Sequence, residues 1–398
     1  MKLLFVVPML PYPPRTGNTL IVYNYIKCLA ARHSVDLISF RGQESAADVR
    51  ALAGWCRHIE LVDAPPLWRV RLNQTLAFVT GQPIYVWAYR SARMAEAVAR
   101  ALRAEPYDVA VFQKTEMAQF RPEGYTGVSI LSMENPMVVN HQRLMELASS
   151  WFARLRWRDR ISRLRRYEQG QVSRFQRVLL INEADARDCQ RVLPGARVDW
   201  VPHGIDADAF SPGDPASRRD GMIVITGNMY HPPNVEAVDV FCREVLPLVL
   251  ARVPSANVWL VGADPAPAVR KWAEHDRITV TGFVEDVRPY LHQARVSVCA
   301  VRLRIGTQTK VLEALACGTP VVTTSAGNHG IGAQSGSDLY VADDPAAMAD
   351  RIAALLEGAQ WQRLSENGRR FVVNNFTWQK GVAKLERIFE DVMREAAS

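Results

Sequence analysis

A lysine and a glutamate, Lys310 and Glu313, stand three residues apart in the segment TQTKVLEALACGTPVV, residues 307–322. The segment predicts a short helix with Lys310 in its first turn. A first turn presents unpaired N–H groups and a partial positive charge, so a lysine there is unfavourable unless an anion docks beside it. Glu313, on the same helix face, could accept hydrogen bonds from hydroxyl groups. The pair indicates either a site for an anion such as a nucleotide diphosphate or an ordinary surface Lys–Glu pair.

The same segment carries signals for both ends of this helix. Thr307 or Thr309 can cap its N-terminus, and the helix runs through Ala316 to a terminating glycine, Gly318. The apolar run 296–300 before it predicts a strand. The anion would therefore lie where a strand ends and a helix begins.

Strand-like apolar runs alternate with helical patterns along the whole chain, which is typical of parallel sheets with crossover helices. The predicted strands are residues 2–7, 35–40, 59–62, 109–112, 128–131 and 178–181 in the first half, and 222–226, 258–261, 278–281, 296–300, 320–323 and 339–341 in the second. Each set is enough for a doubly wound sheet, and ligands of such sheets bind at the carboxyl ends of the strands. We therefore expect an α/β chain with two Rossmann-like domains facing each other across a cleft.

The boundary between these domains is marked by composition. Residues 202–221, PHGIDADAFSPGDPASRRDG, are rich in proline, glycine and aspartate and have almost no apolar periodicity, so we expect a hinge or linker there. This places the N-terminal domain at residues 1–201 and the C-terminal domain at residues 222–377. Residues 378–396 have the spacing of an amphipathic helix, which we expect to pack back on the N-terminal domain.

The bulk composition argues against several classes of protein. The six cysteines form no CxxC pair and the eight histidines no HExxH motif, so we expect buried, reduced thiols and no metal or other cofactor. No run of eighteen apolar residues predicts a membrane-spanning helix. The N-terminal apolar run is short and interrupted by prolines, which favours a strand over a signal peptide. The expected location is cytoplasmic.

The formal net charge of +7 is concentrated in residues 151–177, where nine arginines face only Asp159 and Glu168. Tryptophan, phenylalanine and leucine alternate with these arginines. Such an amphipathic helix suits an anionic membrane surface, which would make the protein peripheral on the inner face of the plasma membrane. The alternative is a helix whose apolar residues pack on the first domain while its arginines are solvated. No nucleic-acid-binding motif accompanies the patch, so we expect no nucleic-acid partner.

Five strings of the sequence together resemble retaining family-4 glycosyltransferases, which are enzymes of the GT-B fold. VRLRIGTQTKVLEALACGTPVVTT is similar to their donor-binding motif, and VTGFVEDVRPYL to their base-binding loop. ITGNMYHPPNVEAVDVFCREVLP resembles the start of the second domain in a bacterial exopolysaccharide-type subgroup. VPHGIDADAFSP resembles the interdomain hinge, and PYPPRTG the glycine loop after the first strand. The resemblance implies transfer of a sugar from a nucleotide-diphosphate-sugar to an acceptor, with retention at the anomeric carbon.

The resemblance also implies roles for individual residues. Lys310 and Arg302 would neutralise the diphosphate leaving group, and Glu313 would bind the ribose. Phe283 and Val284 would hold the base. Glycine leaves no side chain in the way, so the backbone at Gly17 could approach the donor phosphates. The other donor-side candidates are Gly227, Asn228, Thr309 and Gly330, and weaker candidates for acceptor contact are Glu134 and Asn135.

Departures from the family pattern leave alternatives open. Many members carry a glutamate eight positions before Glu313, where this chain has Ile305, and the usual arginine and lysine are replaced by residues 228–231. A nucleotide-sugar epimerase on the same fold and a catalytically silent subunit of a polysaccharide assembly complex are therefore alternatives. Asp206 and Asp208 form a DxD pattern, which suits a turn better than a metal site.

The subgroup resemblance and the basic segment together indicate the acceptor. We expect a glycan or a polyprenyl-linked acceptor, namely a lipid-linked precursor of a bacterial exopolysaccharide or cell-surface polysaccharide. Front-face transfer lets the leaving phosphate take the acceptor's proton, so neither a protein base nor a metal is required. The sugar, the base and the linkage stay open.

Overall fold

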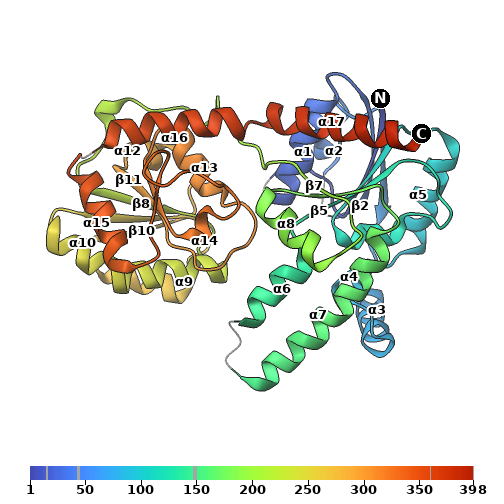
Figure 1. Cartoon of the computed structure of the whole chain (residues 1–398), viewed down its shortest axis with the longest axis horizontal. Helices are drawn as coiled ribbons and strands as arrows, with labels where there is room; N and C mark the ends of the chain where they lie inside the picture. Colours follow the sequence, from blue (N-terminus) through green and yellow to red (C-terminus); the bar gives the residue numbers. More distant parts are fainter. Residues whose placement is uncertain (15–16, 43–44, 147–149, 359, 398) are drawn as a thin grey trace. The chain divides into compact units, whose positions relative to one another are not determined.

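The structure is a computed structural model that describes residues 1–14, 17–42, 45–146, 150–358 and 360–397. It forms two compact units (Figure 1): unit 1 is Met1–Pro202 with Trp378–Ser398, and unit 2 is His203–Thr377. The stretch 202–221 that was predicted as a linker thus falls almost entirely in unit 2.

Unit 1 contains a seven-stranded parallel sheet in the order β3-β2-β1-β4-β5-β6-β7. The order reverses between β1 and β4, as in a doubly wound sheet. The strands are β1 (Lys2–Val7), β2 (Ser34–Arg41), β3 (His58–Asp63), β4 (Val109–Gln113), β5 (Ser129–Glu134), β6 (Arg177–Leu180) and β7 (Val198–Trp200). The helices are α1 (Gly17–Leu29), α2 (Ala46–Leu52), α3 (Leu67–Thr80), α4 (Ile84–Ala88), α5 (Ala92–Ala104), α6 (Met137–Glu146), α7 (Trp151–Val172), α8 (Glu183–Val192) and α17 (Trp378–Ala397), with a 3₁₀ helix, η1 (Thr115–Phe120).

The central strand β1 supplies apolar side chains to both faces of this sheet. Leu3 and Phe5 lie in a cluster with residues of α1 and α17, whereas Leu4 and Val6 lie in a cluster with residues of α5. This alternation is what a strand buried on both faces requires, because successive side chains point to opposite sides. Helix α17, at the end of the chain, therefore covers the same face of the sheet as α1 (Figure 1).

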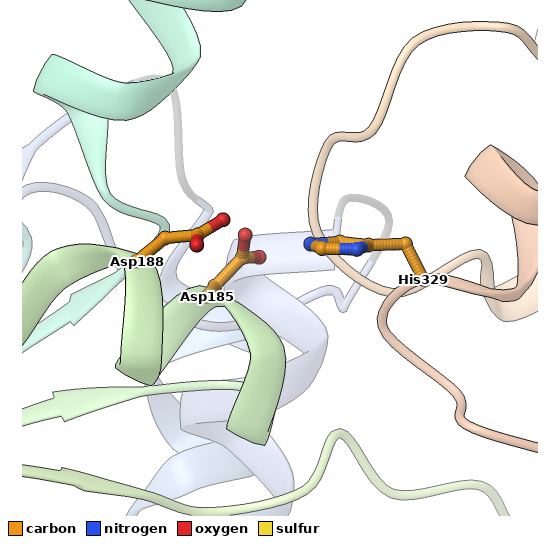
Figure 2. A group of neighbouring side chains, drawn as sticks. All are labelled: Asp185, Asp188 and His329. Atoms are coloured by element: carbon orange, nitrogen blue, oxygen red, sulfur yellow. The ribbon is translucent and has the colours of Figure 1, made fainter.

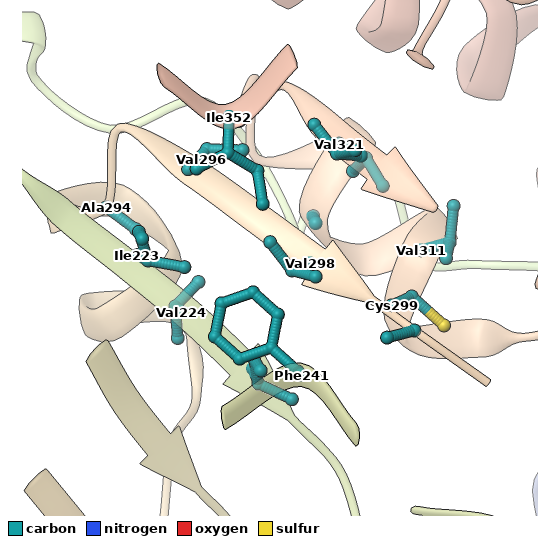
Figure 3. Packing of buried hydrophobic residues seen from close by; sticks show 14 of the residues in the cluster. Ile223, Val224, Phe241, Ala294, Val296, Val298, Cys299, Val311, Val321 and Ile352 are labelled. Carbon is teal, nitrogen blue, oxygen red and sulfur yellow. The ribbon is translucent and has the colours of Figure 1, made fainter. Parts of the chain in front are cut away.

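Unit 2 contains a six-stranded parallel sheet in the order β10-β9-β8-β11-β12-β13, with the reversal between β8 and β11. Its strands are β8 (Met222–Thr226), β9 (Asn257–Val261), β10 (Ile278–Gly282), β11 (Val296–Cys299), β12 (Val321–Thr323) and β13 (Tyr340–Val341). The helices are α9 (Pro232–Val240), α10 (Leu246–Arg252), α11 (Pro267–Arg270), α12 (Arg288–Gln293), α13 (Thr309–Ala316), α14 (Ser325–Asn328), α15 (Pro345–Leu356) and α16 (Trp361–Asn375), with a π-helical turn, η3 (Phe241–Val245). Val224, Phe241 and Val298 are part of its core (Figure 3).

The predicted fold class is confirmed, because every predicted strand is present and both sheets are parallel. The sequence did not reveal β7, whose three half-buried residues carry too little apolar pattern. The six cysteines are free thiols, with Cys28 half-buried and the others buried. Among the described residues, no helix is both long enough and apolar enough to cross a membrane.

Helix α17 gives a direct test of this packing. Phe389 is fully buried in the cluster that joins α17 to α1 and β1. We expect Phe389→Ala to lower the free energy of unfolding of unit 1 by about 3–5 kcal/mol, through lost burial and the cavity left behind. The measurement is urea unfolding followed by hydrogen exchange in peptides of β1 and α1, so that unit 1 is observed separately from unit 2.

The matched control is Glu390→Ala, on the exposed side of the same helix, which should change this free energy by no more than about 0.5 kcal/mol. Equal stability of the two variants would contradict the packing of α17 on unit 1.

Candidate active site

The carboxyl ends of β8 and β11 meet at the point where the strand order of unit 2 reverses. Gly227 follows β8, and α13 follows β11. Gly227 has a φ of +147°, and a Cβ there would lie 3.1 Å from Asn234 Nδ2 and 3.3 Å from Lys310 Nζ. The backbone after β8 therefore lies directly beside the amine of α13, at the position where doubly wound sheets bind ligands.

Lys310 reaches across this point to the N-terminal turn of α9. Its Nζ donates a hydrogen bond of 2.6 Å to Asn234 Oδ1, and Asn234 Nδ2 donates one of 2.9 Å to the carbonyl of Asn228. Lys310 and Glu313 form no ion pair within the described chain, so the interpretation as an ordinary surface Lys–Glu pair is wrong. Asn234 was not among the predicted site residues. A neutral amide satisfies one N–H of the lysine but leaves its charge uncompensated.

The N-terminus of α13 has no side-chain cap, which corrects the prediction for Thr307 and Thr309. Gln308 occupies the cap position without a capping hydrogen bond, and Thr309 is the first helical residue. The hydroxyl of Thr307 donates instead to the carbonyl of Gly330, at 3.3 Å. The predicted C-terminus is confirmed, because Gly318 follows the helix with a φ of +68°. Among the described residues, no side chain accepts a hydrogen bond from the N–H groups at the start of α13.

Gly330 lies against the loop that precedes α13. A Cβ at Gly330 would come within 2.3 Å of the Gly306 carbonyl oxygen, a contact that only glycine permits without movement of the backbone. Gly330 is thus held beside the N-terminus of α13, so the structure brings together Gly227, Asn228, Thr309, Lys310 and Gly330.

Burial raises the pKa of Glu313 to about 7, although the neighbouring Lys310 lowers it. Within the described chain, no hydrogen bond to this carboxyl group forms. The pKa of His231, which precedes α9, is lowered by burial and by the charge of Lys310. The site is thus positively charged and holds an acid whose ionisation is opposed by its surroundings.

Arg302 does not join this group. Its guanidinium pairs with Glu244 of η3 at 3.1 Å, and both side chains are partly exposed. Phe283 follows β10 and is 74% exposed, whereas Val284 packs partly on the core of unit 2. An exposed aromatic ring at the carboxyl end of a strand could stack on a planar group.

In unit 1, Glu134 ends β5 in a strained conformation. Its φ is +64°, and Lys114, which follows the adjacent strand β4, has a φ of +74°. The pairing of β5 with β6 shifts register just before Glu134. Non-glycine residues with positive φ carry strain that the surrounding structure must offset, and they are frequent at functional sites. The strain places two chemically active side chains at the carboxyl edge of this sheet.

The carboxyl group of Glu134 is buried and accepts a hydrogen bond of 2.5 Å from Gln113 Nε2. Its pKa is raised to about 7, mainly by burial and less by Glu116, whereas Lys114 and the bond from Gln113 act to lower it. The side-chain oxygen of Asn135 is buried and has no hydrogen-bond partner among the described residues. Glu134 and Asn135 thus provide an acid and an amide beside each other.

Gly17 is the first residue of α1 and is exposed, with no atom within 4 Å of a Cβ built there. No described residue of unit 1 therefore requires glycine at this position, and its proposed role rests on the sequence. Arg15 and Thr16 of the same loop lie outside the described residues.

Two groups of acidic side chains have structural partners. The Oδ1 atom of Asp206 accepts hydrogen bonds from the backbone N–H groups of Asp208 and Ala209, which is a turn, as the sequence indicated. Asp185 and Asp188 project from α8 (Figure 2) and both pair with Arg143, at 3.1 Å and 2.6 Å. His329, drawn in the same figure, belongs to unit 2.

Residues 220–358 match the family model described as "Glycosyl transferases group 1". The chain is 28% identical over 222 residues to D-inositol 3-phosphate glycosyltransferase of Geodermatophilus obscurus, covering 50% of this chain and 48% of the relative. It is 28% identical over 219 residues to the GDP-mannose-dependent alpha-(1-6)-phosphatidylinositol monomannoside mannosyltransferase of Mycobacterium tuberculosis. This match covers 48% of this chain and 55% of the relative. The match thus spans about half the length of these relatives.

One further relative aligns over nearly its whole length. An uncharacterized 44.6 kDa protein in the cps region of Klebsiella pneumoniae is 19% identical over 405 residues, which cover 99% of each chain.

Solved structures resemble the whole chain. Sucrose-phosphate synthase from Thermosynechococcus elongatus has a TM-score of 0.70 at 19% identity, covering 100% of both chains. Anabaena HepE in complex with UDP and glucose has a TM-score of 0.64 at 14% identity, covering 98% of this chain and 100% of that one. The chain therefore has the GT-B fold. Its residues 220–358 are similar to group 1 glycosyltransferases, and the predicted class of enzyme, a glycosyltransferase, is the one that the family model and these relatives share.

The burial of Glu313 predicts a pH dependence of stability. Because its pKa is about 7 in the folded protein and near 4.5 in the unfolded chain, the folded state binds the proton more tightly between these values. We therefore expect unit 2 of the wild type to lose stability relative to Glu313→Gln as the pH rises from 4.5 to 7, by at most about 3 kcal/mol. Urea unfolding between pH 5 and 8, read by hydrogen exchange in peptides of unit 2, measures this difference.

Glu285→Gln, at an exposed position of the same unit, is the control. Its free energy of unfolding should change with pH in parallel with that of the wild type. Parallel profiles for the wild type and Glu313→Gln would show that Glu313 is not buried as described.

Proposed function

We propose that the chain is a retaining glycosyltransferase that moves a sugar from a nucleotide-diphosphate-sugar to an acceptor. The observation that carries this proposal is the amine of Lys310, which lies 3.3 Å from the position of a Cβ on Gly227, beside the uncapped first turn of α13. A cation, free N–H groups and a close glycine backbone together suit a diphosphate.

The donor diphosphate would displace Asn234 as the partner of Lys310. As the bond between the anomeric carbon and the phosphate oxygen breaks, negative charge develops on that oxygen. A cation and a helix N-terminus already in place stabilise this charge more strongly in the transition state than in the ground state. The acceptor oxygen bonds to the same face of the anomeric carbon, and its proton passes to the leaving phosphate. In this scheme the reaction needs no metal and no other cofactor.

The other donor contacts follow from where the side chains lie. Phe283 is exposed and can stack on the base, with Val284 beside it. Glu313 can accept hydrogen bonds from the ribose. Arg302 contributes only if it leaves Glu244, and an exposed ion pair of this kind is worth no more than about 1 kcal/mol, so a diphosphate could compete for it.

For the acceptor we propose a lipid-linked glycan of bacterial exopolysaccharide or cell-surface polysaccharide synthesis. The full-length likeness to a protein of a cps region supports this choice. Glu134 and Asn135 would contact the acceptor hydroxyl. The basic helix α7 would hold the protein on the cytoplasmic face of the plasma membrane, since arginines near an anionic surface each contribute about 1 kcal/mol.

Substitution of the lysine tests the donor site. We expect Lys310→Met to lower turnover of the correct nucleotide-sugar by tenfold or more, which corresponds to at least about 1.4 kcal/mol. A thermal-shift screen of nucleotide-sugars identifies the donor first, because a ligand at 100 times its dissociation constant stabilises the protein by about 2.7 kcal/mol. The assay then follows release of the nucleoside diphosphate.

Lys271→Met is the matched control, because Lys271 is an exposed lysine of the same unit that pairs with Asp239 at the surface. It should keep both the thermal shift and the turnover. Near-normal turnover in folded Lys310→Met would refute the donor site, whereas donor binding without turnover over a broad acceptor panel would favour the silent binding subunit.

The acidity of Glu134 predicts the pH dependence of the acceptor step. The ionised carboxylate accepts a stronger hydrogen bond from the acceptor hydroxyl than the neutral acid does, so kcat/KM for the acceptor should rise with pH through about 7. Glu134→Gln should remove this rise and lower kcat/KM by about tenfold. Glu116→Gln removes a nearby charge that raises this pKa, so the rise should move to lower pH. An unchanged rise in Glu134→Gln would show that another group titrates.

A further inference from the structure

Unit 1 contains a cavity of about 680 Å³ between four helices. Its lining comes from α3, the turn before α4, α4, α6 and α7. The residues include Phe78, Ile84, Met137, Leu155 and Leu164. A volume of this size and a mainly apolar lining are typical of sites for small molecules. Phe78 is 63% and Leu155 53% exposed, so the cavity opens at the surface.

Three arginines of α7 line the cavity: Arg156, Arg160 and Arg163. Arg163 is already engaged, because it pairs with Asp159 at 2.8 Å and donates to the carbonyl of Phe78 at 2.8 Å. These contacts neutralise one of the three charges and join α7 to the end of α3.

Arg156 and Arg160 have no carboxylate partner among the described residues. Their guanidinium groups lie over the rings of Phe152 and Trp157, at 5.2 Å and 5.4 Å from the ring centres. They are one helical turn apart, a spacing at which like charges repel. Both also line a second cavity of about 240 Å³ with Ala153 and Trp157. Asp159 also lines the cavity but pairs with Arg163, so among the described residues no carboxylate pairs with the two adjacent cations.

The surface around the cavity is unusually apolar. Of the fourteen large hydrophobic side chains that are exposed in the described chain, ten lie on α3, α4 and α7. Figure 1 shows α3 and α7 extending from the same end of unit 1. The second half of α7 packs on this unit through Ile161, Leu164 and Val172, whereas Trp151 and Phe152 at its start are exposed. Patches of this kind mark sites of interaction.

We propose that the cavity takes one hydrocarbon chain of an anionic bilayer lipid and that Arg156 and Arg160 bind its phosphate group. An apolar cavity open at the surface suits a flexible chain, and two guanidinium groups without a carboxylate partner among the described residues suit a phosphate, which accepts several hydrogen bonds from arginine. The exposed apolar side chains of α3 and α7 would lie in the membrane surface around this lipid. The inference deepens the proposed membrane attachment and is independent of sugar transfer.

The two parts of the site can be separated with soluble probes. Dodecyl phosphate carries both chain and phosphate, dodecyl maltoside carries the chain without charge, and inorganic phosphate carries the charge without a chain. By isothermal titration below the critical micelle concentrations, dodecyl phosphate should bind at one site, at least about tenfold more tightly than dodecyl maltoside. Each methylene removed from the alkyl phosphate should weaken binding by about fourfold. Equal affinity for the two amphiphiles, or saturable binding of inorganic phosphate alone, would overturn the proposal.

Two variants with matched controls localise the binding. Leu155→Trp fills the cavity without changing charge, and the double variant Arg156→Glu with Arg160→Glu reverses the two cations. Each should weaken the binding of dodecyl phosphate at least about tenfold. The controls are Leu72→Trp on α3 and the double variant Arg158→Glu with Arg166→Glu on α7, since these exposed residues do not line the cavity. Circular dichroism and melting temperature confirm that all four fold.

Flotation with phosphatidylglycerol and phosphatidylcholine liposomes tests whether the bound lipid belongs to a bilayer. The wild type should float with the anionic liposomes, and Leu155→Trp should float about tenfold less. Full flotation of Leu155→Trp would overturn the assignment to a bilayer lipid. The thermal shift with nucleotide-sugars should be unchanged in Leu155→Trp, so failure here is distinguishable from failure of the proposed glycosyltransferase.

Discussion

The candidate site of unit 2 depends on one constraint, the position of the Lys310 amine where the strand order reverses. Strand β8 brings Gly227 there, β11 leads into α13, and α9 supplies the amide of Asn234 that holds the amine at 2.6 Å. A lysine in the first turn of a helix opposes the helix dipole. The amide orients this cation without neutralising it, so the electrostatic cost persists until an anion binds.

Most of the fold could be predicted because parallel strands are buried on both faces and therefore form continuous apolar runs. The three residues of β7 carry no such run. The contacts of the site are different in kind, since they join residues far apart in the sequence. Lys310 and Asn234 are separated by 76 positions, and the hydroxyl of Thr307 bonds to Gly330 instead of capping α13. Sequence signals for helix ends depend on residues three or four positions apart. They cannot show that a distant carbonyl group, here that of Gly330, competes for the hydroxyl of Thr307. The resemblance located the motif, but the partner of its lysine required the folded chain.

In each unit one glutamate has a pKa that burial raises and a nearby lysine lowers. Glu134 and Glu313 are each buried enough to have a pKa near 7, and in each case a lysine, Lys114 or Lys310, opposes the shift. The sequence shows the glutamates but not their burial, which depends on the strands and helices around them. Glu134 also has a φ of +64°, at a point where the pairing of β5 with β6 shifts register. Strain of this kind is retained where a side chain must be placed for a purpose other than stability.

The arginines of residues 151–177 divide into two groups that net charge alone could not distinguish. Toward the end of the segment they are structural: Arg177 pairs with Asp199 and Glu395, and Arg174 donates to the carbonyl of Arg121. Toward the start, Arg156 and Arg160 rest on aromatic rings beside an apolar cavity. The interpretation as a helix packed on unit 1 therefore holds for the second half of α7, and only the first half has the exposed side chains that the interpretation as a surface-binding helix requires. The first half differs from the second in two features: Arg156 and Arg160 have no carboxylate partner among the described residues, and Trp151 and Phe152 are exposed.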